Sequence, residues 1–119
     1  MIADYIARTR ATPFAWGRCD CCTWPADYIV ERHGIDPMAD LRGAYSTAFG
    51  ARQIKIAQGG ILGLWQDRLR FLPPGSDVVL ATWRGAVIGG LMQDGFLMLK
   101  TGKDIMLTRK FSLIAGWSV

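Results

Sequence analysis

The spacing of apolar residues changes near the middle of the chain, and this change limits the possible folds more than any other feature. In the first half, apolar residues recur at helical intervals, as in Ile2, Tyr5 and Ile6. From Val78 onward they form short runs separated by turn dipeptides that contain glycine. Helices followed by strands predict an α+β domain, in which N-terminal helices pack on one face of a C-terminal antiparallel sheet.

Four helices are expected in the first half. The central one should run from about residue 21 to residue 33, because Asp20 supplies an acidic N-cap and Gly34 a C-terminal stop. The other three are expected over residues 2–9, over residues 46–57 with Ser46 as the N-cap, and over residues 61–69.

Five strands are expected in the second half. Three dipeptides, Arg84-Gly85, Asp94-Gly95 and Thr101-Gly102, mark turns between the first four strands, so these strands should form an antiparallel meander. A last strand should close the sheet and tie the end of the chain into it. The expected strands cover residues 78–82, 86–91, 96–100, 105–108 and 114–119.

The composition fits a single domain over residues 1–119. With 119 residues, 50% hydrophobic and 20% charged, the chain can bury a core without a metal, a cofactor or a disulfide. Three cysteines, two of them adjacent, suit neither a disulfide framework nor a paired Cys-x-x-Cys zinc site. They are therefore expected to be reduced thiols.

Charge and hydropathy limit the partners. No apolar run is long enough to span a bilayer, and the N-terminus lacks a signal-peptide pattern, so the protein should stay in the cytosol where it is made. The net charge is +4, but Lys and Arg are scattered from Arg8 to Lys110 without a dense block. We therefore expect no nucleic-acid partner.

The Asp20-Cys21 pair stands where the central helix should begin. Unpaired backbone N–H groups at a helix start favour a thiolate, so Cys21 is a candidate nucleophile. Free cysteines are also common as inert core residues, and this interpretation stays open for Cys19, Cys21 and Cys22. A metal site is not expected, because Cys21 and Cys22 should point in different directions on a helix.

Aromatic residues suggest a contact site elsewhere. Trp16 and Trp117 are expected in the core. Trp83 lies beside Arg84 in a predicted hairpin turn, so this pair is the candidate interaction site. The Gly89-Gly90 pair has no phosphate-binding context and is expected at a turn or a site of close packing.

Several motifs carry a family resemblance. They are Pro13-Phe14-Ala15-Trp16-Gly17-Arg18-Cys19-Asp20-Cys21-Cys22, Ala26-Asp27, Gly34-Ile35-Asp36-Pro37, Arg42-Gly43-Ala44-Tyr45, Ser76-Asp77-Val78-Val79 and Gly116-Trp117-Ser118-Val119. The chain resembles a small phage and prophage family of unknown function, itself similar to NlpC-type cell-wall cysteine peptidases. This resemblance implies a papain-like fold.

The resemblance also assigns catalytic positions. Cys21 matches the nucleophile, with Asp20 before it, and the histidine base should stand within residues 85–89, where no histidine occurs. The chain has one histidine, His33, twelve residues after Cys21. On a continuous helix these residues are about 18 Å apart, too far for a nucleophile and its base.

The expected function follows from this gap. The resemblance implies a pseudoenzyme that is a structural component of a phage or phage-like tail, in the tail-tip or baseplate region, with other tail proteins as partners. It would be made in the host bacterial cytoplasm and incorporated in the virion tail. The alternative is a cysteine peptidase or amidase that acts on peptidoglycan, with Cys21 as nucleophile and an unidentified base.

Overall fold

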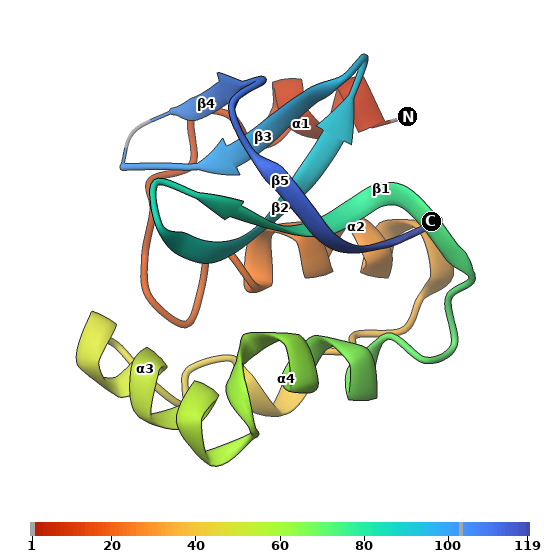
Figure 1. Ribbon diagram of the computed structural model, residues 1–119. Coiled ribbons are helices and arrows are strands. Elements are labelled where there is room, and N and C mark those ends of the chain that lie inside the picture. Colours follow the sequence, from red (N-terminus) through yellow and green to blue (C-terminus); the bar gives the residue numbers. More distant parts are fainter. Residues whose placement is uncertain (1, 103) are drawn as a thin grey trace.

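The computed structural model describes residues 2–102 and 104–119. Within them, four α-helices precede five antiparallel strands (Figure 1), which confirms the α+β prediction. None of the described helices is long and apolar enough to cross a bilayer. The helices are α1 (Ile2–Thr9), α2 (Thr23–His33), α3 (Ala48–Ala57) and α4 (Gly60–Arg68), with a short 3-10 helix at Ala39–Leu41. The strands are β1 (Pro74–Trp83), β2 (Ala86–Gln93), β3 (Phe96–Lys100), β4 (Ile105–Thr108) and β5 (Ser112–Trp117).

The predicted C-terminal end of the central helix is confirmed, and the Asp20 side chain caps its start, but the helix begins at Thr23, two residues later than expected. The Asp20 carboxylate accepts hydrogen bonds from the backbone N–H groups of Cys22 and Thr23, both at 2.9 Å, as an N-cap does. At the other end, Gly34 has a φ of 70° and donates its N–H to the carbonyl of Val30 at 2.8 Å. A left-handed residue at this position ends a helix at little cost when it is glycine.

Some predicted boundaries were wrong. The N-cap of α3 is Thr47 rather than Ser46, because the Thr47 hydroxyl accepts the N–H of Gly50 at 3.0 Å. The short 3-10 helix was not predicted. Strand β1 starts at Pro74, four residues early, because Pro74 pairs with Trp117 of β5 across the sheet. A pairing between such distant segments leaves no local signal in either one.

The predicted meander is confirmed, with the strand order β4-β3-β2-β1-β5. The two tight hairpin turns use left-handed residues, with φ of 50° at Arg84 and 78° at Gly85, and 53° at Asp94 and 80° at Gly95. Two consecutive left-handed residues define the type I′ turn, whose twist matches that of paired strands. These turns therefore fix the register of β1 with β2 and of β2 with β3.

The sheet must curl, because three residues, 109–111, link its two edge strands. Such a link spans at most about 14 Å, whereas the edges of a flat five-stranded sheet lie about 19 Å apart. The curl encloses a second core of Val79, Ala81, Leu97 and Leu99, all fully buried. In Figure 1 no helix covers this side of the sheet.

The other side of the sheet packs on the helices and forms the main core. Tyr5 of α1, Trp24 of α2 and Trp65 of α4 are buried there with Leu80 and Trp117 of the sheet. The core prediction for Trp117 is confirmed. The prediction for Trp16 was wrong: this residue is partly exposed, lies outside both core clusters and packs edge-on against Phe14, with ring centroids 4.8 Å apart.

A buried lysine fixes α1 to the sheet. Lys100 of β3 is 3% exposed, and its Nζ donates to the carbonyls of Thr9 at 2.9 Å and Arg10 at 3.2 Å. These carbonyls lie at the C-terminus of α1, where the helix dipole is negative. The ammonium group therefore caps the helix through two of its three N–H donors.

Candidate functional site

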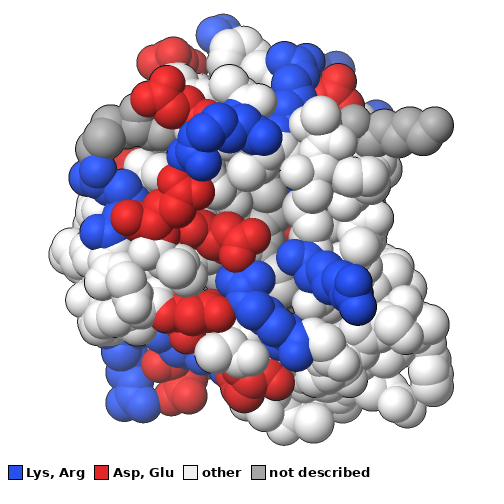
Figure 2. Space-filling view, turned by 180° about the vertical axis from the view of Figure 1, so that it is seen from behind, with Lys and Arg blue, Asp and Glu red and all other residues white. Residues whose placement is uncertain are grey.

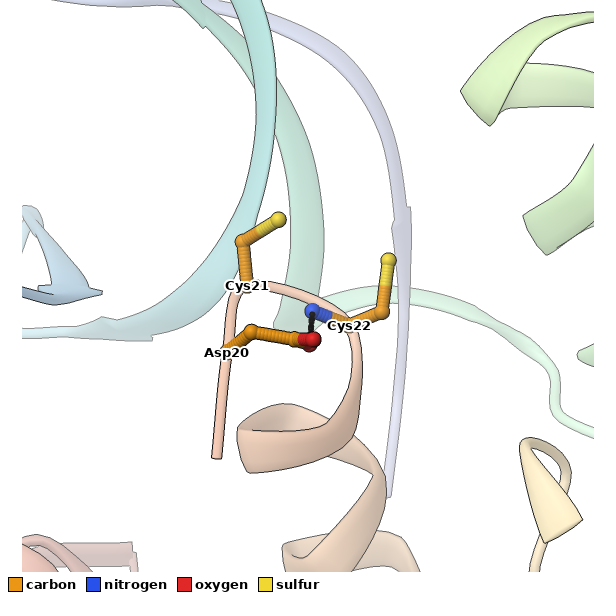
Figure 3. A group of neighbouring side chains, drawn as sticks. All are labelled: Asp20, Cys21 and Cys22. Atoms are coloured by element: carbon orange, nitrogen blue, oxygen red, sulfur yellow. Dashed lines mark hydrogen bonds between the residues drawn. The ribbon is translucent and has the colours of Figure 1, made fainter. Parts of the chain in front are cut away.

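The candidate site is the turn of Asp20, Cys21 and Cys22 at the start of α2 (Figure 3). All three residues are buried. The turn depends on Gly17, whose φ of 78° favours glycine and whose added Cβ would lie 2.3 Å from the carbonyl oxygen of Tyr45. The loop before α2 and the loop after the 3-10 helix are therefore in direct backbone contact at this site.

The Asp20 carboxylate is fully occupied by hydrogen bonds. One oxygen accepts the N–H groups of Cys22 and Thr23 and the Thr23 hydroxyl, and the other accepts the Gly17 N–H at 2.8 Å and the Tyr45 hydroxyl at 2.5 Å. Burial alone would raise the pKa of Asp20, but these bonds outweigh it and hold that pKa below its ordinary value. Asp20 is thus an ionised helix cap with no acceptor position left for a substrate proton.

The two thiols lie on the same side of the turn. Figure 3 shows both side chains on the side away from the Asp20 carboxylate, and the sulfurs and a carboxylate oxygen lie within 4.8 Å of one another. The prediction that Cys21 and Cys22 diverge was wrong, since their sulfurs lie within 4.8 Å of each other; both residues precede the first residue of α2.

Because the two thiols lie close together, their pKa values shift in opposite directions. A hydrogen bond from the Cys22 thiol lowers the pKa of Cys21 to about 7 against the opposing effect of burial, with help from Lys55 and the Gly89 N–H. The same hydrogen bond and burial raise the pKa of Cys22. The proton therefore stays on Cys22, and Cys21 is the sulfur that ionises first.

Strand β2 and helix α4 close the space in front of Cys21. A Cβ on Gly89 would lie 2.4 Å from the Trp65 ring and 2.5 Å from the Cys21 carbonyl oxygen. The Trp65 indole N–H also donates to the Cys22 sulfur at 3.3 Å. No side chain fits at position 89, which confirms the close-packing interpretation of the glycine pair, and the described part of the chain encloses no pocket.

Residues 85–89 were expected to hold a base, and besides Gly89 one other residue of this segment lies on the same side of the sheet. Val87 pairs with Thr82, two positions along the ladder from the Gly89–Leu80 pair, and so faces the same side of the sheet. Its side chain is 39% exposed and cannot carry a proton. No residue of the segment 85–89 therefore carries a side chain that could act as a base.

The remaining predicted residues lie apart from this turn. His33 is the last residue of α2, as expected, with Nε2 3.1 Å from the carbonyl oxygen of Val119 and its ring edge-on to Phe71. In the β1–β2 turn, the Arg84 guanidinium lies over the Trp83 ring, 4.6 Å from its centroid. Arg84 is exposed, while Trp83 is partly buried against the second core.

Among the described residues, Asp20, Cys21 and Cys22 form the one group of potential metal ligands whose ligand atoms lie within 4.8 Å of one another. The two thiols are available as ligands. Both carboxylate oxygens already accept bonds from the helix start and from Tyr45, so a metal ion would have to break the N-cap of α2. The cluster therefore offers two ligands, fewer than a structural metal site uses.

Trp65 and Gly89 are the site residues that the sequence analysis did not single out as such. A tryptophan on the apolar face of a helix is typical of a core residue, and only the glycine pair indicated close packing.

Comparison with known proteins places the whole chain in one family. The model of a domain of unknown function, DUF6950, matches residues 1–119. No curated protein and no solved structure matches the chain.

Proposed function

We propose that this chain, which belongs to the DUF6950 family, is a papain-like domain without a complete catalytic dyad that serves as a structural component of a phage or phage-like tail. The observation that supports the loss of the catalytic dyad is the set of residues around Cys21. The Cys21 carbonyl oxygen packs against Gly89, which also lies against the Trp65 ring, and residues 85–89, where the resemblance places a base, carry no titratable side chain.

The arrangement of elements supports the papain-like assignment. The candidate nucleophile lies at the start of a buried helix, and that helix packs on an antiparallel sheet that follows it in the chain. The Asp-Cys pair, the glycine before it and the strand opposite the cysteine occur in the order that the resemblance implies. Asp20 keeps a clear role in this arrangement as the N-cap of the helix.

The acidic groups nearby do not replace the missing base. Asp20 is engaged as a cap, Asp27 lies 2.7 Å from a guanidinium nitrogen of Arg42, and Asp77 accepts the backbone N–H of Val119 at 2.8 Å. A carboxylate is a weak base for a thiol, and an ionised carboxylate cannot protonate a leaving amine at neutral pH. Amide hydrolysis lacks its general acid.

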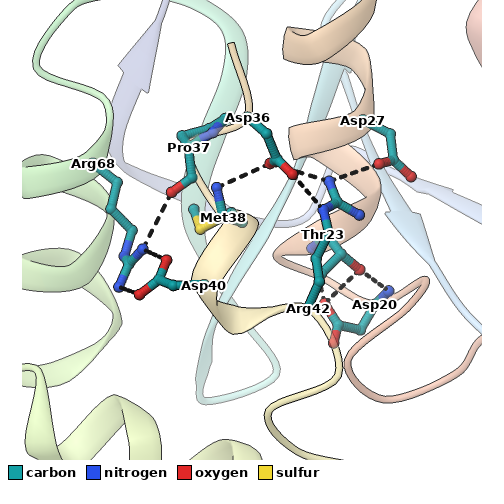
Figure 4. Close-up of polar contacts among 9 residues, drawn as sticks. All are labelled: Asp20, Thr23, Asp27, Asp36, Pro37, Met38, Asp40, Arg42 and Arg68. Carbon is teal, nitrogen blue, oxygen red and sulfur yellow. Dashed lines mark hydrogen bonds and ion pairs between the residues drawn. The ribbon is translucent and has the colours of Figure 1, made fainter.

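Family motifs outside the turn have structural roles. Figure 4 shows Arg42 between two carboxylates, 2.7 Å from an oxygen of Asp27 on α2 and 2.7 Å from an oxygen of Asp36 in the following loop. Asp36 also accepts the N–H of Met38 at 3.0 Å. These bonds hold the loop after α2 against the helix. Motif residues that stabilise the domain would be retained after catalysis is lost.

The molecular surface is compatible with protein contacts. Figure 2 shows acidic and basic side chains interspersed on the face seen from behind, without one large patch of a single sign. Arg84 and Trp83 in the β1–β2 turn remain the proposed contact with other tail proteins, since a partner would bury an exposed guanidinium and an aromatic ring together.

The tail assignment rests on the family resemblance and is tested with particles. We expect the protein in purified tails or virions from a strain that carries the gene, detected by quantitative mass spectrometry at a fixed ratio to other tail proteins. A matched strain with Trp83→Ala and Arg84→Ala should lose this incorporation, while Phe49→Ala on α3 should not. Absence from wild-type particles would refute the tail role.

One observation favours the alternative, a peptidoglycan peptidase or amidase. Because the pKa of Cys21 is lowered to about 7, a large share of this thiol is ionised at neutral pH without any histidine. This function would need a base supplied by a partner chain. It predicts cleavage of peptidoglycan peptides that is lost in Cys21→Ala.

A further inference from the structure

The two edges of the curled sheet differ in how they are protected. Strand β4 is four residues long and is flanked by the charged residues Asp104 and Arg109. Strand β5 is six residues long, Ser112–Trp117, and contains neither a charged residue nor a proline. Charges, prolines, β-bulges and short length are the usual means by which sheet edges avoid pairing with another chain. Strand β5 contains a bulge but has no charged residue within it or directly beside it, so it is the less protected edge.

The side chains of β5 reinforce this difference. Leu113 is 53% exposed and Ile114 is 40% exposed. Ile114 is the extra residue of a β-bulge, since Leu113 pairs with Ala81 and Ala115 pairs with Leu80. In Figure 1 no helix lies over β5, which crosses the front of the molecule. The edge therefore presents adjacent apolar side chains together with backbone groups that no described strand pairs.

We propose that β5 is a homodimer interface, in which a second copy of this chain adds its own β5 in antiparallel orientation. Antiparallel pairing of identical strands is two-fold symmetric, so the backbone donors and acceptors of one edge match those of its copy. Because the strand carries no charge, the symmetry brings no like charges together. The inference does not depend on the proposed function.

Charges beside the strand favour a second copy as the occupant. Lys110 precedes β5 and is exposed, whereas Asp77 lies beside the end of β5, next to the Val78–Trp117 pair. In an antiparallel pair, the start of one strand lies opposite the end of the other. Lys110 of each copy therefore lies near Asp77 of its partner, and such charge complementarity favours a specific contact.

Helix α3 is the competing apolar surface, and self-association there is unfavourable. Phe49 is 69% exposed and Ile56 is 68% exposed, and their spacing of seven residues puts them on one face. The exposed residue Arg52 lies between them, and the helix has Lys55 but no acidic residue. Two copies of α3 would bring like charges together. Phe49 therefore provides a matched control for the β5 contact.

The test is the molar mass in solution, measured by sedimentation velocity at concentrations up to roughly 200 µM, because a single strand pair gives a small and weak interface. A reducing agent excludes disulfide-linked species. We expect a concentration-dependent shift from the 13.2 kDa monomer toward twice that mass. Leu113→Lys should abolish the shift, and Phe49→Lys should leave it unchanged.

Ile114→Lys is the second variant, in case Leu113→Lys disturbs the fold, and circular dichroism checks both. A wild-type protein that stays monomeric over the whole range would overturn the proposal. So would a dimer that persists in both β5 variants, or one that Phe49→Lys also removes, because the contact would then lie elsewhere or be unspecific.

Discussion

Replacing Asp20 tests whether the aspartate beside Cys21 is a structural cap. In Asp20→Asn one carboxylate oxygen becomes an amide NH₂ group, which cannot accept hydrogen bonds. If the remaining oxygen keeps its bonds to the start of α2, the amide faces the Tyr45 hydroxyl and the Gly17 N–H. The hydroxyl can rotate and accept, but the backbone N–H loses its buried partner.

The expected loss of stability follows from these bonds. An unsatisfied buried N–H costs about 1–3 kcal/mol, and loss of a negative charge at a helix start about another 1 kcal/mol. We therefore expect Asp20→Asn to lower the free energy of unfolding by about 2–4 kcal/mol. Asp20→Ala should cost more, because Cys22 and Thr23 then lose their N–H partner as well.

Urea unfolding followed by tryptophan fluorescence measures this loss, with Asp104→Asn as the control for removal of an exposed ion-paired carboxylate. The effect should also depend on pH. Because the pKa of Asp20 is lower in the folded state, its contribution is complete above the unfolded-state pKa of about 3.9 and disappears as the pH falls through the folded-state value. Neutral surface substitutions usually change the free energy of unfolding by less than about 0.5 kcal/mol. An Asp20→Asn variant whose free energy of unfolding lies within that range of the wild-type value would refute the capping role.

Three further predictions concern the surroundings of Cys21 and the attachment of α1. Gly89→Ala should destabilise the fold by about 2–3 kcal/mol, because the new methyl group meets the Trp65 ring and the Cys21 carbonyl, whereas Gly102→Ala, with nothing within 4 Å, should be neutral in the same urea assay. The rate of Cys21 alkylation by iodoacetamide, followed by peptide mass spectrometry, should rise with pH with a midpoint near pH 7. Cys22→Ala should move that midpoint upward. An unchanged midpoint would contradict the hydrogen bond between the two thiols. Lys100→Met should cost about 2 kcal/mol through the lost bonds to the carbonyls of Thr9 and Arg10, while Lys110→Met should leave the melting temperature unchanged.

Features with local causes were predictable from the sequence. Asp20 and Gly34 define the ends of α2, because a cap and a left-handed stop act within one turn of the helix. The hairpin turns at Arg84-Gly85 and Asp94-Gly95 were predictable for the same reason. The N-cap of α3 was displaced by one residue, since Ser46 and Thr47 are both good caps and the choice depends on where the preceding loop arrives.

Features that depend on distant segments were not predictable. The closure in front of Cys21 brings Trp65 of α4 onto Gly89 of β2, two positions whose contact no local pattern reports. The early start of β1 depends on its pairing with Trp117. The absence of a histidine from residues 85–89 was visible in the sequence, but the packing that closes the space was not.

The main proposal is that this domain retains the nucleophile position of a cysteine peptidase without its chemistry. The most direct test is the release of peptide fragments from purified peptidoglycan between pH 5 and pH 9, by wild type and Cys21→Ala at equal concentration. The account predicts that neither protein releases fragments above the buffer control. Release by the wild type that is lost in a folded Cys21→Ala variant would contradict it.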